Sequence, residues 1–365
     1  MSQILLLSSI KPLTAILQLT AFMLFTIDSK TGKIKYTKLN FFIALTAIIF
    51  QFIIHYVFWI SCFDFIFIGT EVFKNGIPKL IYANLTTYGL TKVWLFIKRH
   101  EIAEMIQNLS NIDEKLSEIG CKIDYKEDRK SLTILILSIV LIIITMFIFA
   151  FVIMRTILTE SNPIISIFHI ESFTSFTLII LQVLLTLFSI KRRFEIINSQ
   201  ISTKNLKKLA EIHLEITTLI ENFNEIFGFV MLLCTAIVFG WFCMFVFSIV
   251  MISSQLIHFP FLMAFDTIVN VIIIGTFVTI IYFAECAKNE GRKTIKLLYM
   301  ELHKIEDQKL CSNIQNFIHQ IVITKNEFSC RLFDLSWTFL FKFLTTVAMY
   351  FVILVQFESS FKKDK

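Results

Sequence analysis

The sequence predicts an all-α membrane protein with seven transmembrane helices and a cytoplasmic N-terminus. Of its 365 residues, 56% are hydrophobic, and the mean hydropathy is +0.74, which is typical of a chain that crosses a bilayer several times. Several apolar runs reach the length of about 20 residues that a membrane helix needs. Lys and Arg gather between alternate runs, and this bias predicts the orientation.

Seven apolar segments have the required length and composition. We predict spans at residues 40–62, 76–97, 131–154, 166–190, 228–252, 262–286 and 336–357. The second is the weakest, because Asn84, Thr86, Thr87 and Lys92 interrupt its apolar character. The earlier segment 4–27 is also apolar but is broken by a Lys-Pro pair and a Gln, so we interpret it as a helix that lies on the membrane surface or re-enters it.

The distribution of basic residues predicts which segments lie inside. The segments predicted to be cytoplasmic hold 26 Lys and Arg and the outer segments hold 6, with Lys92 and Lys342 inside spans. This excess places the N-terminus inside and, after seven spans, the C-terminus outside. The chain then divides into a cytoplasmic segment 1–39, transmembrane helices 1–4 within 40–190, a cytosolic helix 191–227, transmembrane helices 5 and 6 within 228–286, cytosolic helices 287–335, transmembrane helix 7 at 336–357 and an extracellular C-terminus 358–365.

Prolines support the same topology. Pro78, Pro163 and Pro260 each precede or open an even-numbered span. Proline is tolerated in the first turn of a helix, where its missing N–H would have no intrahelical partner. The three helices predicted to descend from outside to inside therefore begin with the same signal.

Two of the inner segments have an apolar stripe at helical spacing. Residues 205–228 place Leu, Ile and Phe every three or four positions, and residues 294–325 repeat the pattern. We predict helices that continue spans four and six into the cytosol and pack together. The alternative is a pair of helices that lie flat on the membrane surface.

Several classes of function leave no trace in the sequence. There is no HExxH, GxSxG, P-loop or GxGxxG motif, and the seven histidines do not pair at ligand spacing, so we predict no enzyme, no cofactor and no metal site. The net charge of +6 is spread between spans and does not indicate a nucleic-acid partner. Spans with almost no internal Gly or Pro argue against a transporter, and an inside N-terminus argues against a G-protein-coupled receptor.

The end of the chain carries a recognisable pattern. In MYFVILVQF, Tyr350 is followed by five hydrophobic residues and then Gln356 and Phe357. This resembles the signature of the insect gustatory receptor family, with Met349 where that signature has Thr. Further similarities lie in TIDSKTGKIKYTKLN, in HLEITTLIENFNEIFG through His213, Asn224, Phe227 and Gly228, and in FSCRLFDLS, where Arg331 replaces the usual Gly.

The resemblance implies a ligand-gated cation channel made of four subunits. In that family the seventh spans line a central pore, and the cytosolic helical extensions form an anchor. The resemblance also implies that Gln356 and Phe357 lie near the outer mouth, where the pore narrows. An apolar ring at such a constriction can block ions by dewetting. The alternative role for Gln356 is a hydrogen bond to a neighbouring helix near the interface.

Helical spacing refines which residues face the pore. Tyr350 and Gln356 are six residues apart, about 240° around a helix, so both cannot face one axis. If Gln356 lines the pore, Val352 and Met349 do so too, and we expect Tyr350 to pack against span five or a neighbouring subunit.

Polar residues in the outer halves of the spans predict a ligand pocket. Five candidates share one inferred depth in the membrane: Tyr88, Arg155, His169, Glu171 and Asp266. A sixth, Trp241, is an aromatic residue in the middle of span five. Charged groups inside spans are costly unless they serve a site. Packing is the alternative role for Trp241. By resemblance, Phe351 follows the motif's Tyr350 where the main sugar-receptor branch has Glu, which argues against that branch, while the fructose branch has a hydrophobic residue there and stays open.

The expected partners follow from this interpretation. They are a small-molecule tastant, the lipid bilayer and other copies of the chain or other gustatory receptors, in a homotetramer or heterotetramer in the plasma membrane of sensory neurons. The competing interpretation is a seven-span chemoreceptor or membrane scaffold that conducts nothing.

Overall fold

The computed structural model describes residues 26–27, 34–35, 38–62, 71–121, 123, 163–201, 205–253 and 260–363, with scattered residues between 130 and 148. Two short strands, β1 (Thr26–Ile27) and β2 (Ile34–Lys35), pair antiparallel. The helices are α2 (Lys38–Cys62), α3 (Glu71–Ile97), α4 (Arg99–Glu118), α6 (Pro163–Ser199), α7 (Leu206–Ser253), α8 (Pro260–Leu302), α9 (Gln308–Ile323) and α10 (Trp337–Lys363).

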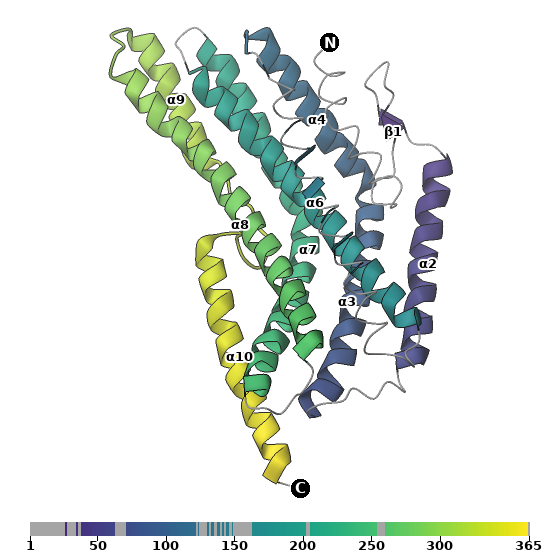
Figure 1. The fold of residues 1–365 in the computed structure, drawn as a ribbon. Coiled ribbons are helices and arrows are strands. Elements are labelled where there is room, and N and C mark those ends of the chain that lie inside the picture. The colour runs from purple at the N-terminus through teal and green to yellow at the C-terminus, as the bar shows by residue number, and fades with distance from the viewer. Residues whose placement is uncertain are drawn as a thin grey trace.

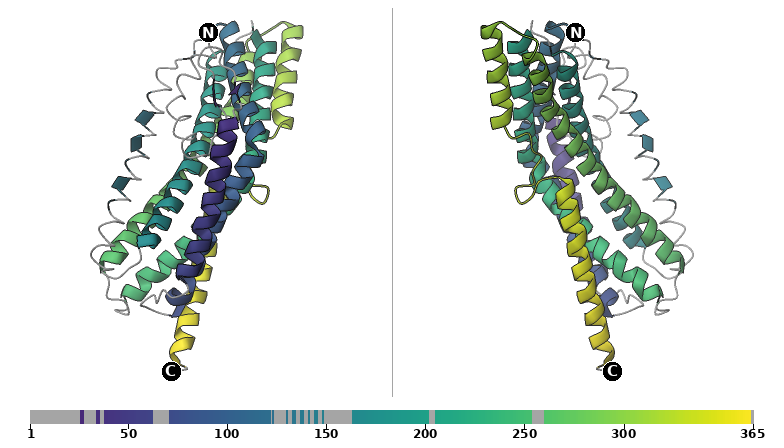
Figure 2. Two further views of the ribbon diagram at one scale, coloured as in Figure 1. Left: turned by 90° about the vertical axis from the view of Figure 1, so that its right-hand side faces the viewer. Right: turned by 90° about the vertical axis from the view of Figure 1, so that its left-hand side faces the viewer.

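The described helices form one elongated bundle. The helices α6, α7 and α8 run along its length, α9 lies at one end, and the end of α10 lies at the other (Figures 1 and 2). With 48 residues, α7 is about 72 Å long, more than twice the roughly 30 Å of a bilayer core. It therefore extends well beyond any membrane that it crosses. Among the described residues, four helical segments are long and apolar enough to span a membrane: Thr174–Ser199, Leu206–Val250, Asn270–Leu302 and Trp337–Ser360.

The long helices differ in one respect from the sequence-based expectation. The helices α6 and α8 do continue past the predicted spans and pack together, and at this end Asn198 of α6 donates to the Glu290 backbone carbonyl of α8 at 2.9 Å. The amphipathic stretch 205–228, however, does not extend span four. It is the first half of α7, because α6 ends at Ser199 and the chain turns before Leu206.

The helix α4 was not predicted, and a buried ion pair fixes it to α6. The Arg193 guanidinium donates to both oxygens of Asp113, at 3.0 and 2.8 Å. Both side chains are almost fully buried. A paired and doubly hydrogen-bonded arrangement is the condition under which buried charges are tolerated, so removing either partner would leave an uncompensated charge.

The second predicted span, doubtful because of Lys92, is part of the helix α3. Lys92 donates to the Oε1 of Gln51 on α2 at 2.7 Å, and Gln51 is only 1% exposed. The polar positions of α3 therefore connect it to its neighbours. The third predicted span, 131–154, falls mostly outside the described residues. Its described residues Ser138 and Thr145 donate to carbonyls four positions earlier, as helical residues do.

Candidate functional site

The motif residues of α10 lie on the face that the rest of the chain leaves uncovered. Met349 is 63% exposed, Val352 51% and Phe357 57%, and Gln356 is exposed beside them. The opposite side carries the buried residue Val347. As the spacing predicts, Gln356, Val352 and Met349 share one face of the helix.

Tyr350 of the same motif contacts α7. Its ring meets that of Phe239 edge to face, with the centroids 5.3 Å apart. Phe343, two turns earlier on α10, packs against Phe239 and also against Phe277 of α8, at 5.7 and 5.4 Å between centroids. Aromatic contacts of this kind attach α10 to α7 and α8 along one side.

Among the four described segments that are long and apolar enough to span a membrane, the one in α10 is the least covered. Its most apolar window is 11% buried within the chain, compared with 78% for α6. Apolar side chains on the open face are compatible with lipid, but Gln356 is not, because an amide in hydrocarbon without a partner costs several kcal/mol, about 4–8 on the most apolar reference scale. Within the described chain the Gln356 side chain makes no hydrogen bond. This face therefore requires water or a partner outside the chain.

The segment 324–336, which we call the strap, joins α9 to α10 and is held by Asn224 of α7. The Asn224 amide donates to the Glu327 backbone carbonyl at 2.8 Å, and its Oδ1 accepts the Ser329 N–H at 2.8 Å. Beside it, a Cβ on Gly228 would lie 3.0 Å from the Ser329 carbonyl oxygen. The glycine allows the strap to approach α7 closely, and the amide supplies the hydrogen bonds that an extended backbone lacks.

Within the strap the chain makes a tight reversal. Cys330 N–H donates to the Phe333 carbonyl and Leu335 N–H to the Phe328 carbonyl, both at 2.8 Å. Arg331, between them, has a φ of 68°. This left-handed conformation suits glycine, and Arg331 adopts it at a cost because it has a Cβ.

Next to the strap, four segments of the chain meet around His213. Its ring lies 5.0 Å from that of Phe194 on α6 and 5.6 Å from that of Phe317 on α9. Its Nε2 is 3.4 Å from the Gly291 carbonyl of α8, which can only accept, so Nε2 carries the proton. His213 lies outside the apolar stretch 228–252, and burial lowers its pKa from 6.5 to about 4. The imidazole is therefore neutral at physiological pH.

Of the predicted pocket residues, Tyr88 and Trp241 have described side chains. Tyr88 is 3% exposed and its ring packs against Phe176 of α6 at 6.1 Å, while Trp241 is half-buried on α7. His169 and Glu171 lie on α6 and Asp266 on α8, and their side chains, like all of Arg155, lie outside the described residues. The described candidates therefore come from α3, α6, α7 and α8, and whether their side chains line one pocket stays a prediction.

A polar stripe on α3 extends this region beyond the predicted residues. Four polar residues share one face of this helix: Asn84, Thr87, Tyr88 and Thr91. Thr87 and Tyr88 lie three and four residues after Asn84, and Thr91 lies four and three residues after them. Thr91 is fully buried, and among the described residues neither its hydroxyl oxygen nor the Asn84 Oδ1 has a hydrogen-bond partner. Polar atoms held inside an apolar bundle without partners are candidate contacts for a ligand. The three-and-four spacing within 84–91 is the sequence signal that could have identified the stripe.

This fold and site define a multi-pass helical membrane protein with a buried polar stripe and a largely uncovered last helix. The family model for the 7tm chemosensory receptor matches residues 10–361, so the chain belongs to that family. The family is one of receptors, and the protein is a chemosensory receptor, not an enzyme.

Solved structures of one insect receptor share the fold. The olfactory receptor OR5 from Machilis hrabei aligns with a TM-score of 0.74 at 12% sequence identity, covering 98% of this chain and 100% of that one. The same receptor in complex with eugenol aligns with a TM-score of 0.68 at 13% identity and the same coverage. No curated protein sequence matches this chain significantly.

Proposed function

We propose that the protein is a gustatory receptor that acts as a tastant-gated, non-selective cation channel, in which four subunits each contribute α10 to a central pore. The observation that carries the proposal is Gln356 on the uncovered face of α10. Around a four-fold axis that face meets water and the neighbouring subunits, which removes the cost of placing an amide in lipid.

The charge distribution supports the proposed orientation. The end of the bundle that contains α4, α9 and the beginning of α7 carries most of the Lys and Arg, which favours a cytoplasmic location. The C-terminal end of α10 then lies outside the cell, in the plasma membrane of a sensory neuron. The assignment to taste over smell rests on the motif Tyr350, Gln356 and Phe357.

We place the ligand site in the outer part of the bundle, beside the polar stripe of α3. Tyr88, Arg155, His169, Glu171, Asp266 and Trp241 remain its proposed residues. Because OR5 was solved with eugenol, a small and mostly apolar ligand is the class we favour. Phe176 beside Tyr88 supports an apolar wall.

Planar bilayer recording of the purified protein tests the proposal. Single-channel currents that increase with a tastant would support it. Surface-expressed, correctly folded protein that stays silent with a broad ligand panel would favour the second candidate, a non-conducting chemoreceptor or scaffold. Cross-linking of the same preparation would show whether it contains four copies.

A further inference from the structure

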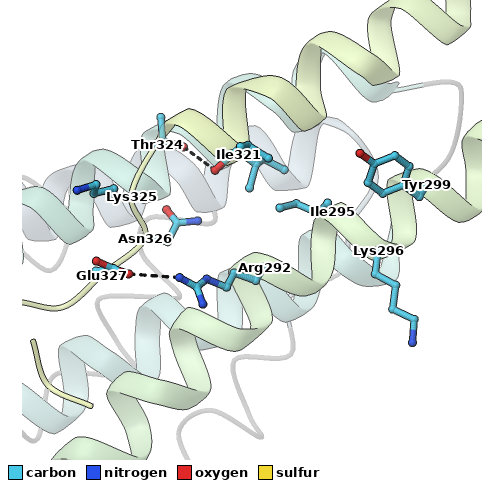
Figure 3. Close-up of a pocket in the computed structure, with 10 residues that line it drawn as sticks. Arg292, Ile295, Lys296, Tyr299, Ile321, Thr324, Lys325, Asn326 and Glu327 are labelled. Carbon is cyan, nitrogen blue, oxygen red and sulfur yellow. Dashed lines mark hydrogen bonds and ion pairs between the residues drawn. The ribbon is translucent and has the colours of Figure 1, made fainter. Parts of the chain in front are cut away.

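A pocket of about 490 Å³ lies between α8, the end of α9 and the strap. Figure 3 shows Arg292, Ile295 and Tyr299 of α8 facing Ile321 of α9, with Asn326 of the strap between them. This volume falls in the range of about 300–1,000 Å³ that small-molecule sites occupy. The pocket is far along the chain from the polar stripe of α3 and is separate from the proposed tastant site.

The pocket carries an excess of positive charge. Three of its lining residues are cations, Arg292, Lys296 and Lys325, and one is an acid, Glu327. That single carboxylate is already shared, because its Oε1 lies 3.3 Å from Arg292 and 3.7 Å from Lys288. Within the described chain, Lys296 and Lys325 have no acidic partner. The pocket therefore offers cations without matching anions.

Other lysines in and just beyond the same part of α8 form ion pairs with glutamates of that helix. Lys293 lies 3.2 Å from Glu290, and Lys304 lies 2.7 Å from Glu301. These pairs are three residues apart on the same helix, the spacing that brings side chains together. The unpaired Lys296 between them is thus a local exception that coincides with the pocket.

A neutral donor adds to the cations. Asn326 is 5% exposed, and its Oδ1 accepts from the Thr217 hydroxyl at 2.8 Å. The nitrogen of the amide points toward the space between Ile295 and Ile321 (Figure 3). The single proton of the Thr217 hydroxyl is shared with the His213 carbonyl, which lies 3.1 Å away. In the described chain this nitrogen donates to no other group. A buried amide that keeps a free N–H beside several cations is a suitable contact for an anion.

We infer that this pocket binds a ring that carries two or more phosphates, through Arg292, Lys296, Lys325 and the Asn326 amide. Lys325 and Lys296 lie on opposite sides of the pocket (Figure 3), so one phosphate cannot contact both. The apolar side chains Ile295 and Ile321 between them fit the face of a ring.

The ring has two possible sources, a soluble inositol polyphosphate and the headgroup of a phosphoinositide lipid. Arg292 lies six residues, about 9 Å, beyond the predicted inner end of span six at residue 286. A headgroup at the membrane surface can reach this distance, and basic pockets next to membrane helices attract anionic headgroups.

A binding experiment tests the inference without depending on channel activity. The purified full chain is titrated with inositol hexakisphosphate in detergent, and separately placed in phosphatidylcholine nanodiscs with or without phosphatidylinositol 4,5-bisphosphate, while thermal stability is recorded. The test variant is Lys296→Gln with Lys325→Gln. The matched control is Lys293→Gln with Lys304→Gln, which removes the same charge from paired positions. Asn326→Asp is a third variant of nearly the same shape, which keeps the acceptor for Thr217, loses the amide donor and adds a negative charge that opposes a bound anion.

We expect saturable stabilisation of the wild-type and control proteins by at least one of the two probes. The test variant and Asn326→Asp should need on the order of tenfold more ligand, about 1.4 kcal/mol of binding free energy, since each weakens the attraction of the pocket for a phosphate. The arm that responds identifies the source, solution or lipid. Equal weakening in the test and control variants would show nonspecific charge attraction, and no saturable stabilisation in either arm would show that the pocket does not bind a phosphorylated ring. Either result overturns the inference.

Discussion

Asn224 and Ser329, 105 residues apart in the chain, are joined by a hydrogen bond of 2.8 Å from the Ser329 N–H to the Asn224 Oδ1. The same side chain donates to the Glu327 carbonyl. One amide in α7 therefore fixes two backbone groups of the strap, and the strap leads directly into α10. Because loops depend on such contacts for their backbone hydrogen bonds, Asn224 holds the part of the strap that lies eight residues before α10.

Asn224→Leu should loosen the strap. Both backbone groups lose their partners, and the expected loss of folding free energy is about 2–3 kcal/mol. Thermal denaturation of the detergent-solubilised protein measures it. Asn222→Leu is the matched control, because Asn222 lies two residues earlier on another face of α7 and makes no such bond. Similar melting temperatures for both variants would show that the hydrogen bonds between Asn224 and the strap contribute nothing to stability.

Arg331→Gly should stabilise the protein. A φ of 68° is strained for Arg and relaxed for Gly, and this gain exceeds the extra flexibility that Gly brings to the unfolded chain, leaving about 0.5–1 kcal/mol. Leu332→Gly serves as the comparison, since Leu332 is 76% exposed and its φ is not positive. A rise in melting temperature for Arg331→Gly alone is the expected result, and a fall would mean that the Arg331 side chain matters more than its backbone.

His213 should make the stability of the protein depend on pH. Its folded-state pKa, about 4, lies below the unfolded value of 6.5, so the unfolded chain binds the proton more readily. Stability contributed by the neutral ring is present above pH 6.5 and is lost as the pH falls toward 4, by about 3 kcal/mol.

His213→Phe tests this dependence, since it keeps a ring between Phe194 and Phe317 without a titratable group. The variant should show a flatter stability profile between pH 6.5 and 4 than the wild type. His303→Asn, at an exposed position, is the control and should keep the wild-type slope. If His213→Phe keeps that slope too, other groups account for acid sensitivity.

Local sequence signals predicted most helices, whereas contacts between distant segments were beyond them. Pro163 and Pro260 mark the first residues of α6 and α8, whereas Pro78 lies inside α3, which begins at Glu71. The apolar run ending at Phe357 predicts most of α10. The helix α4 was missed although its sequence carries a helical signal, because the buried residues Ile102, Met105, Leu109, Ile112 and Leu116 stand three or four positions apart. The pairing of Asp113 with Arg193, 80 residues later, leaves no such signal and is seen only in the fold.

The candidate site shows the same division. The shared face of Met349, Val352 and Gln356 follows from helical spacing alone, and so does the contact of Tyr350 with another helix. The strap does not, because Asn224 and Ser329 are paired only by the fold. The predicted pocket residues Glu171 and Asp266 stay predictions, since a common depth in the membrane cannot be derived from sequence when the tilt of each helix is unknown.

Thr91→Val should change ligand sensitivity without harming the fold. Thr91 is fully buried, and its hydroxyl has no partner in the part of the chain that the structure describes. Its replacement by a methyl group of similar size should therefore stabilise the protein by about 1 kcal/mol if nothing else binds there. If the hydroxyl contacts the tastant, half-saturation should shift roughly fivefold or more to higher concentration, with unitary conductance unchanged.

Two further variants test the same pocket, and the unitary conductance distinguishes an effect on the pocket from an effect on the pore. Asp266→Ala and Glu171→Ala should shift half-saturation in the same experiment. A dose response that stays at the wild-type value in all three variants would exclude this region as the ligand site. A change in unitary conductance would instead assign the residue to the ion pathway.

The last prediction concerns the outer end of α10, where Phe357 and Gln356 lie on the uncovered face. In the proposed tetramer a ring of four Phe357 side chains blocks hydrated cations, because an ion cannot exchange its water for hydrocarbon at tolerable cost. Phe357→Ser or Phe357→Asn makes the ring polar and should give a current without ligand. Gln356→Ala should keep the resting current low and reduce the open-channel conductance, since the ion loses a polar contact.

Surface labelling must first show that the variants reach the plasma membrane in wild-type amounts, so that misfolding is not taken for gating. Patch-clamp recording then gives resting current, evoked current and unitary conductance for each. Ser359→Ala is a useful control, because its hydroxyl is bonded to backbone carbonyls of α10 itself. Wild-type resting and evoked currents in both the Phe357 and Gln356 variants would exclude this position as the gate. The constriction would then lie deeper on the same face, at Val352 or Met349.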